Sequence, residues 1–108
     1  MASNRPRVRV PRNPAKGDVM TIKTLISHEM ETGQRRDDEG NVIPRNIIHS
    51  FKCVYNGTPV FEADMYPGVS ANPYFEFYVK AVESGELEFI WTEDGGQTFS
   101  TKEKIEVS

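Results

Sequence analysis

The 108-residue sequence has a single cysteine, Cys53. One thiol cannot form an internal disulfide, and it excludes the zinc sites that are built on paired thiolates. Long apolar runs are also missing, because stretches such as Leu25-Ile26 and Val42-Ile43 are far below the roughly 20 residues needed to cross a bilayer. The sequence therefore predicts neither a disulfide-stabilised domain nor a membrane-associated protein.

The sequence also lacks an excess of basic residues. Its formal net charge is -3, with arginines concentrated near the beginning and glutamates toward the other end. A phosphate-binding domain typically needs a basic face, so the acidic total argues against nucleic acid as a partner.

The length and composition fit one folded domain. Hydrophobic residues make up 37% of the chain and charged residues 27%, which provides one core and a soluble exterior. We expect a single domain over residues 1–108, with residues 1–6 flexible. The first residues contain no apolar segment of roughly 7 to 15 residues, as a secretory signal would, and so by themselves favour the cytoplasm.

Apolar and polar residues alternate along most of the chain, and clusters of Gly, Pro, Asn and Asp separate the runs. Alternation of this kind is typical of half-buried strands, and Asn56-Gly57 is a strong hairpin signal that predicts antiparallel pairing of its flanking strands. In the run from Met20 to Ile26, Leu25 falls out of phase, which indicates either a bulge or a buried second face. About seven short strands predict an all-β, immunoglobulin-like antiparallel β-sandwich.

The inward phase of these strands predicts the core. One face of each central strand carries large aromatic side chains, and we expect these to pack together between the sheets. They are Phe51, Phe75, Phe77, Phe89 and Trp91.

A long polar segment runs from Met30 to Pro44 between two of the predicted strands. It is too polar to pack and too long for a tight turn, so we expect a surface loop, a kind of segment that often has a function. Asp37, Asp38 and Glu39 within it do not continue into a calcium-binding pattern and indicate a solvated run of charges.

No residue pattern predicts catalysis. Cys53 alternates in phase with Phe51 and Tyr55 in mid-strand, which favours a packed core position over a nucleophile; a partly exposed thiol that pairs with a partner is the alternative. His49 and Cys53 are about 13 Å apart on an extended strand, too far to bind one ion, and His28 lies on another segment. We therefore predict no catalytic, cofactor-binding or metal-binding residue.

Aromatic side chains on an outer strand face favour contact with a partner. Tyr74 and Tyr78 lie on the strand face opposite Phe75 and Phe77, and Ile90 is similarly placed on its own strand. Isolated exposed apolar residues are also ordinary on protein surfaces. The residues thus predict a binding or scaffold domain.

Three blocks of the sequence stand out, in this order: Leu25 to Arg35, Asn56-Gly57 with Val60 to Asp64, and Val69 to Tyr74. Together they resemble the SoxZ family, and the resemblance runs from about Val8 to Val107. Where the family usually has a proline after the histidine of the first block, this sequence has Glu29.

The resemblance implies an immunoglobulin-like, non-catalytic subunit of a sulfur-carrier heterodimer. Its partner would be SoxY, which carries sulfur intermediates on a cysteine in a glycine-rich arm, and it would contact the thiosulfate-oxidising Sox enzymes transiently. Cys53 lacks flanking glycines, so the resemblance does not assign it the role of a sulfur carrier. The resemblance also implies a periplasmic location, reached by export with SoxY, whose leader serves both chains. The isolated chain could also self-associate.

We predict a SoxY interface at exposed apolar residues and at the two loops that the resemblance marks. A small sulfurtransferase that uses Cys53 is the alternative function, followed by a free-standing adhesion-type sandwich. The predicted interface residues are Met30, Tyr66, Val69, Asn72, Tyr74 and Tyr78.

Overall fold

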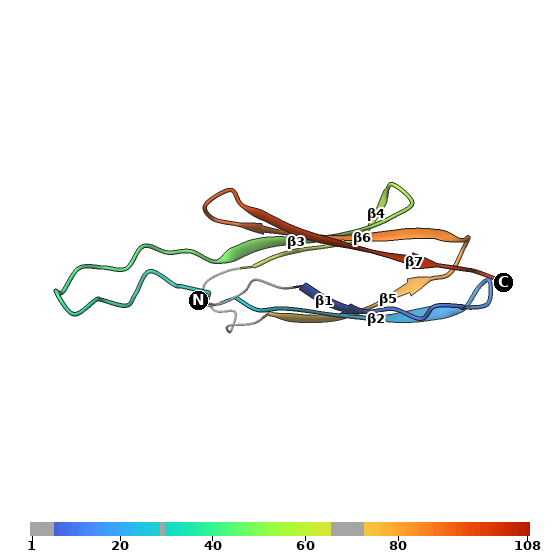
Figure 1. Ribbon diagram of the computed structural model, residues 1–108, viewed down its shortest axis with the longest axis horizontal. Coiled ribbons are helices and arrows are strands. Elements are labelled where there is room, and N and C mark those ends of the chain that lie inside the picture. The colour runs from blue at the N-terminus through green and yellow to red at the C-terminus, as the bar shows by residue number, and fades with distance from the viewer. Residues whose placement is uncertain (1–5, 29, 66–72) are drawn as a thin grey trace.

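The protein is a two-layer β-sandwich (Figure 1). The structure, a computed structural model, describes residues 6–28, 30–65 and 73–108. These residues form seven strands and no helix, so they contain no helical segment able to cross a bilayer. The strands are β1 (Pro6–Arg9), β2 (Val19–Ile26), β3 (Ile48–Tyr55), β4 (Thr58–Asp64), β5 (Tyr74–Lys80), β6 (Gly85–Glu93) and β7 (Thr98–Ile105).

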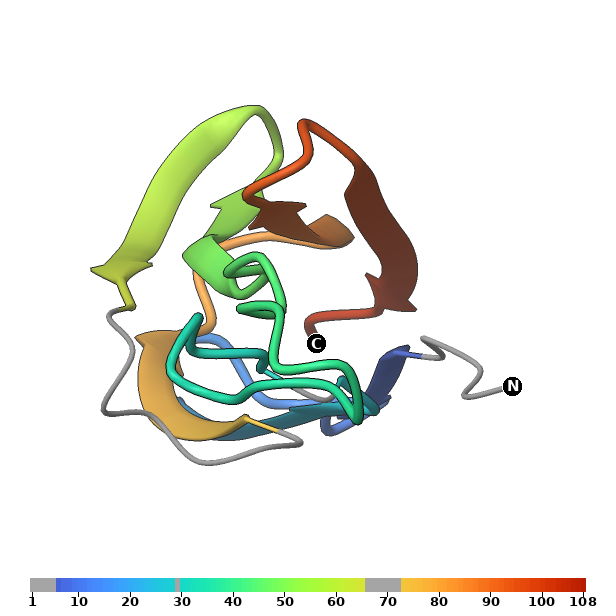
Figure 2. The same cartoon turned by 90° about the vertical axis from the view of Figure 1, so that its left-hand side faces the viewer.

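The strands divide into a small and a large antiparallel sheet. The small sheet has the order β1-β2-β5, and the large sheet has the order β4-β3-β6-β7. Figure 2 looks along the sandwich and shows the two sheets facing each other across the core. The predicted immunoglobulin-like sandwich is confirmed, and Asn56-Gly57 joins β3 to β4 as the hairpin signal indicated.

The core lies between the sheets and is dominated by aromatic rings. Phe51, Phe89 and Trp91 are fully buried, and the ring centroids of Phe51 and Trp91 are 4.9 Å apart. Phe77 is buried as well, and the half-buried Phe75 stacks on Phe51 at 5.1 Å. The predicted core is therefore confirmed, because alternation along each strand directs these rings inward.

Strand irregularities differ from the expected ones. Leu25 sits in an unbroken ladder opposite Tyr74, so the bulge proposed for β2 is absent and Leu25 is half-buried on the outer face. The register instead shifts in β3, between Ile48 and Ser50 and again between Cys53 and Val54. The first shift breaks the alternation, which is why Ile48 is buried although strict alternation from Phe51 would direct it outward.

Candidate partner interface

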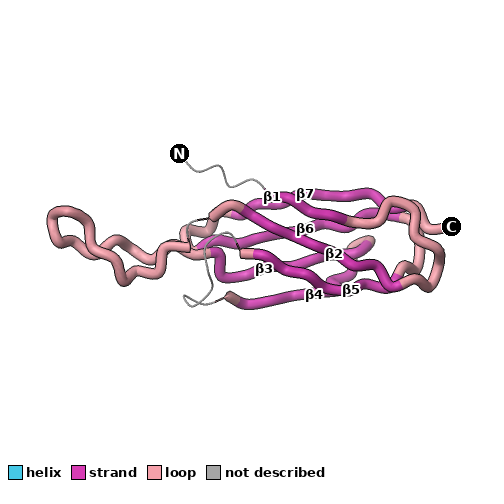
Figure 3. Tube along the Cα trace, turned by 90° about the horizontal axis from the view of Figure 1, so that it is seen from below, coloured by secondary structure: helices cyan, strands magenta, loops and turns pink. Residues whose placement is uncertain are grey.

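Residues 31–46 form a polar arm that projects beyond the sandwich between β2 and β3 (Figures 1 and 3). Its two halves are bridged at Glu31 with Asn46 and at Arg36 with Val42. At the tip, Asp37 Oδ1 accepts hydrogen bonds of 2.9 Å from the backbone N–H groups of Glu39 and Asn41. The predicted surface loop is thus confirmed, with a compact carboxylate-capped turn at its end.

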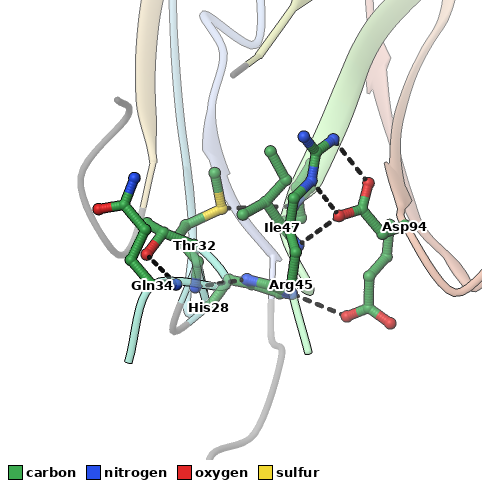
Figure 4. Close-up of polar contacts among 9 residues, drawn as sticks. His28, Thr32, Gln34, Arg45, Ile47 and Asp94 are labelled. Atoms are coloured by element: carbon green, nitrogen blue, oxygen red, sulfur yellow. Dashed lines mark hydrogen bonds and ion pairs between the residues drawn. The ribbon is translucent and has the colours of Figure 1, made fainter. Parts of the chain in front are cut away.

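The base of the arm is held to the turn between β6 and β7 (Figure 4). Arg45 donates to both carboxylate oxygens of Asp94, from Nε at 2.8 Å and from Nη2 at 3.2 Å, and the backbone N–H of Ile47 donates to Asp94 at 3.2 Å. The Arg45 guanidinium holds the pKa of the Asp94 carboxyl below its ordinary value. These contacts fix where the arm leaves the sandwich.

Gly33 and Arg45 approach closely where the two halves of the arm leave the sandwich. Gly33 has φ +84°, and a Cβ there would come within 3.1 Å of the Arg45 Cβ. Glycine suits both the left-handed backbone and the close approach.

Met30, predicted to contact a partner, lies in the core. Its side chain is 4% exposed, and its sulfur accepts a hydrogen bond of 3.3 Å from the backbone N–H of Ile48. Its backbone has φ 54°, a left-handed conformation, at the point where the chain turns into the arm. In this conformation Met30 supports the base of the arm and offers no side-chain surface to a partner.

The outer face of the small sheet presents exposed aromatic and apolar side chains among cations. Tyr74 is 54% exposed and Tyr78 is 64% exposed, both on β5 at the edge of that sheet. They share this face with outward residues of β1 and β2, and we call the set the tyrosine face. It comprises Arg7, Arg9, Thr21, Lys23, Leu25, Tyr74, Glu76 and Tyr78.

The strand register brings Leu25 between Tyr74 on one side and Arg7 on the other. A hollow of about 320 Å³ lies among these residues, with Arg9 and Lys23 also in its lining. An apolar hollow beside an aromatic ring and rimmed by cations can accept a partner side chain, as the anchoring sites of protein interfaces do.

Glu76 organises the polar part of the tyrosine face. It accepts a hydrogen bond from the Tyr74 hydroxyl at 3.3 Å and pairs with Lys23 Nζ at 3.8 Å. Partial burial and then the Glu76 carboxylate raise the pKa of Tyr74, so the phenol keeps its proton at neutral pH. Tyr74 is therefore available as an aromatic surface with a hydrogen-bonding end.

The cysteine is poorly suited to act as a nucleophile. Cys53 is fully buried in β3, and burial raises the pKa of its thiol to about 12. Its predicted core position is confirmed.

Among the residues that the structure describes, no group of three or more His, Cys, Asp or Glu side chains is placed to hold a metal ion.

The structure brings Tyr74 and Tyr78 together on one face and leaves Met30 at the base of the arm. The other three predicted interface residues, Tyr66, Val69 and Asn72, lie outside the described residues. Sequence reasoning missed Leu25 as a member of this face. The available signal was that Leu25 is apolar at a position where the alternation of its strand predicts an outward side chain.

These features define an immunoglobulin-like β-sandwich domain with a surface suited to protein contact. The chain belongs to the SoxZ family, because residues 8–104 match the family described as Sulphur oxidation protein SoxZ. Family membership gives the chain a role in Sox sulfur oxidation. No curated protein matches it.

Solved structures with the same fold have low sequence identity. The sulfur carrier protein SoxY from Chlorobium limicola f thiosulfatophilum has a TM-score of 0.68 at 12% identity, covering 98% of this chain and 81% of that one. The superoxide reductase (neelaredoxin) from Ignicoccus hospitalis has a TM-score of 0.76 at 16% identity, covering 99% and 82%. Identities this low show a shared fold alone.

Proposed function

We propose that this chain is the non-catalytic subunit of a periplasmic sulfur-carrier heterodimer. It binds SoxY and helps to present the cysteine-bound sulfur intermediates of SoxY to the thiosulfate-oxidising Sox enzymes, and it reaches the periplasm together with SoxY. Membership of the SoxZ family supports the sulfur-oxidation role, and the solved SoxY with the same fold supports a partner of similar shape.

The observation that carries the proposal is the tyrosine face. Tyr74 and Tyr78 expose more than half of their surface on an edge strand, although the removal of an aromatic ring from water is energetically favourable. Interface cores are enriched in tyrosine and arginine, and this face combines both with Leu25. SoxY is the partner that the family relationship favours for it.

The size of a stable interface extends the proposal to a second element. Stable heterodimers bury roughly 1,200 to 2,000 Å² in total, which is more than two tyrosines and their neighbours supply. The arm projects from the sandwich and buries little of its own surface, so it can contact a partner that is bound beside it. In this proposal the tyrosine face anchors SoxY and the arm adds polar contacts around it.

The buried thiol argues against a sulfurtransferase. A cysteine nucleophile needs an accessible sulfur and a lowered pKa, and Cys53 has neither. Sulfur chemistry in the complex would then depend on the cysteine of SoxY.

The experiment introduces charge into the tyrosine face and measures heterodimer formation. We expect Tyr74→Asp and Tyr78→Asp each to weaken SoxY binding at least about thirtyfold in calorimetric titrations, because a carboxylate would replace a central aromatic anchor. Val82→Asp is the matched control, since Val82 is 55% exposed but lies outside the tyrosine face. Circular dichroism checks that all three variants fold. Wild-type affinity in both folded tyrosine variants would place the interface elsewhere and reject the proposal.

A further inference from the structure

The edge strands β1 and β7 belong to different sheets and lie side by side (Figures 2 and 3). Just beyond them the chain segments are joined, because the N–H of Glu106 donates to the carbonyl of Arg12 at 2.9 Å and the N–H of Ser108 donates to that of Pro14 at 3.1 Å. Residue numbers rise together along this junction, so the segments run parallel. Between the strands is a groove of about 870 Å³, which we call the basic groove.

The basic groove has an apolar part and an excess of cations. The half-buried Val8 and Val10 contribute the apolar surface. Its charged lining consists of four cations and two carboxylates, in a chain whose formal net charge is -3. The cations are Arg9, Arg12, Lys102 and Lys104, and the carboxylates are Glu103 and Glu106.

The cations of the groove differ in their ion pairs. Lys102 pairs with Glu86 at 3.8 Å, whereas Arg9, Arg12 and Lys104 form no ion pair or side-chain hydrogen bond with any residue that the structure describes. Unpaired cations gathered along one groove create a positive potential that attracts an anionic ligand.

The form of the groove favours an extended ligand over a compact one. It is bordered by the outer edges of two strands, where backbone N–H and C=O groups are unpaired within their sheets. An extended peptide can add to such an edge through main-chain hydrogen bonds while its side chains reach pockets beside it. Charged side chains on edge strands also prevent self-association of sheets, and either sign of charge can do this. The β4 edge strand, for example, carries the exposed acids Glu62 and Asp64. Prevention of self-association therefore does not explain why the charges of the groove are mostly positive.

We infer that the basic groove binds an extended acidic polypeptide segment, which pairs with the edge of β1 or β7 and places carboxylates against Arg9, Arg12 and Lys104. This inference does not depend on SoxY binding at the tyrosine face. The partner is identified by its chemistry: several carboxylates alternate with apolar side chains, the carboxylates meet the cations and the apolar residues meet Val8 and Val10.

The test titrates the folded chain with a synthetic peptide of about ten residues in which Glu and Val alternate, with an otherwise identical Lys-Val peptide as the ligand control. We expect the acidic peptide alone to bind, and its affinity to fall when salt is raised from about 50 mM to about 300 mM. Arg12→Glu and Lys104→Glu, both at groove residues outside the tyrosine face, should each weaken binding at least about tenfold. Lys80→Glu, at an exposed cation outside the groove, should leave the affinity unchanged.

Amide chemical shifts locate the bound peptide. We expect the acidic peptide to perturb the N–H signals of Val8 to Val10 and of Lys102 to Lys104, and inorganic phosphate at matched charge to compete weakly. Displacement of the peptide by low phosphate concentrations would identify a small-anion site and reject the inference. Shifts confined to the tyrosine face, equal binding of the basic peptide, or unchanged affinity in both folded charge-reversal variants would also reject it. Binding of SoxY by those variants reports separately on the proposed function.

Discussion

The Nε2 atom of His28 lies 2.7 Å from Glu93 Oε2, although the two residues are 65 positions apart and both side chains are buried. The backbone N–H of Met30 donates to His28 Nδ1 at 2.9 Å, so the ring proton resides on Nε2 and is donated to the carboxylate. This pair joins the end of the small sheet to the end of the large one.

We expect Glu93→Ala to lower the free energy of unfolding by about 2 to 4 kcal/mol, because it leaves a buried donor on His28 without its carboxylate acceptor. Urea denaturation measures the loss. Glu88→Ala, at a half-buried glutamate on the same strand, is the control and should cost much less. In a double-mutant cycle, strictly additive losses for His28→Ala and Glu93→Ala would contradict the coupling.

The contact between Arg45 and Asp94 predicts a pH dependence of stability. Arg45 holds the pKa of folded Asp94 below its ordinary value of 3.8, so the stabilisation is complete above that pH and is lost as pH falls through the lowered value. We expect Arg45→Gln to reduce this acid-induced loss, measured as urea midpoints between about pH 5 and about pH 2.5. Arg36→Gln, elsewhere on the arm, should retain the wild-type profile. Identical profiles for Arg45→Gln and wild type would show that the contact does not stabilise the fold.

Cys53 should be protected from alkylation while the chain is folded. Its thiol is buried and its pKa is raised to about 12, so almost no accessible thiolate exists at neutral pH. We expect iodoacetamide to modify the native chain at least about a hundredfold more slowly than the urea-unfolded chain, as measured by mass spectrometry. Rapid native alkylation, or a persulfide on Cys53 after incubation with thiosulfate, would overturn its structural role.

Two aromatic substitutions separate core packing from surface contact. We expect Trp91→Ala to cost roughly 3 to 5 kcal/mol, because it leaves a large cavity beside Phe51. Tyr78→Ala, at a residue that is 64% exposed, should change stability by less than about 1 kcal/mol. Thermal and urea unfolding compare them, and similar losses in both would contradict the assigned register.

The Trp91 indole N–H adds a second comparison. It has no acceptor among the described residues, so Trp91→Phe should cost much less than Trp91→Ala, because it removes an unsatisfied donor while retaining most of the ring. Equal losses for the two substitutions would show that the indole nitrogen has an important role in the native core.

Local alternation was sufficient to predict the strands and the core, since the side chains of a strand point alternately to its two faces. Phe51 and Trp91 lie inward for that reason. Alternation cannot anticipate a register shift, and the shift in β3 buries Ile48, which strict alternation from Phe51 would direct outward. The prediction of Met30 as an interface residue failed because alternation does not reveal backbone conformation either. Met30 has a left-handed backbone, and its side chain lies in the core.

The candidate sites were harder to predict than the fold because they depend on contacts between distant segments. Tyr74 and Tyr78 could be placed on an outer face from their own strand, whereas Leu25 joins them only through the pairing of β2 with β5. The basic groove likewise requires β1 and β7 to lie side by side, although nothing in either strand's own pattern indicates it.

The chain has one tryptophan, and the structure places it at the centre of the sandwich, with no exposed surface. Its intrinsic fluorescence therefore reports on the integrity of the core and should shift to longer wavelengths when the sheets separate. A ligand bound to the tyrosine face or to the basic groove would leave this emission almost unchanged. One optical signal can thus reveal whether a surface variant has lost a contact or has lost its fold.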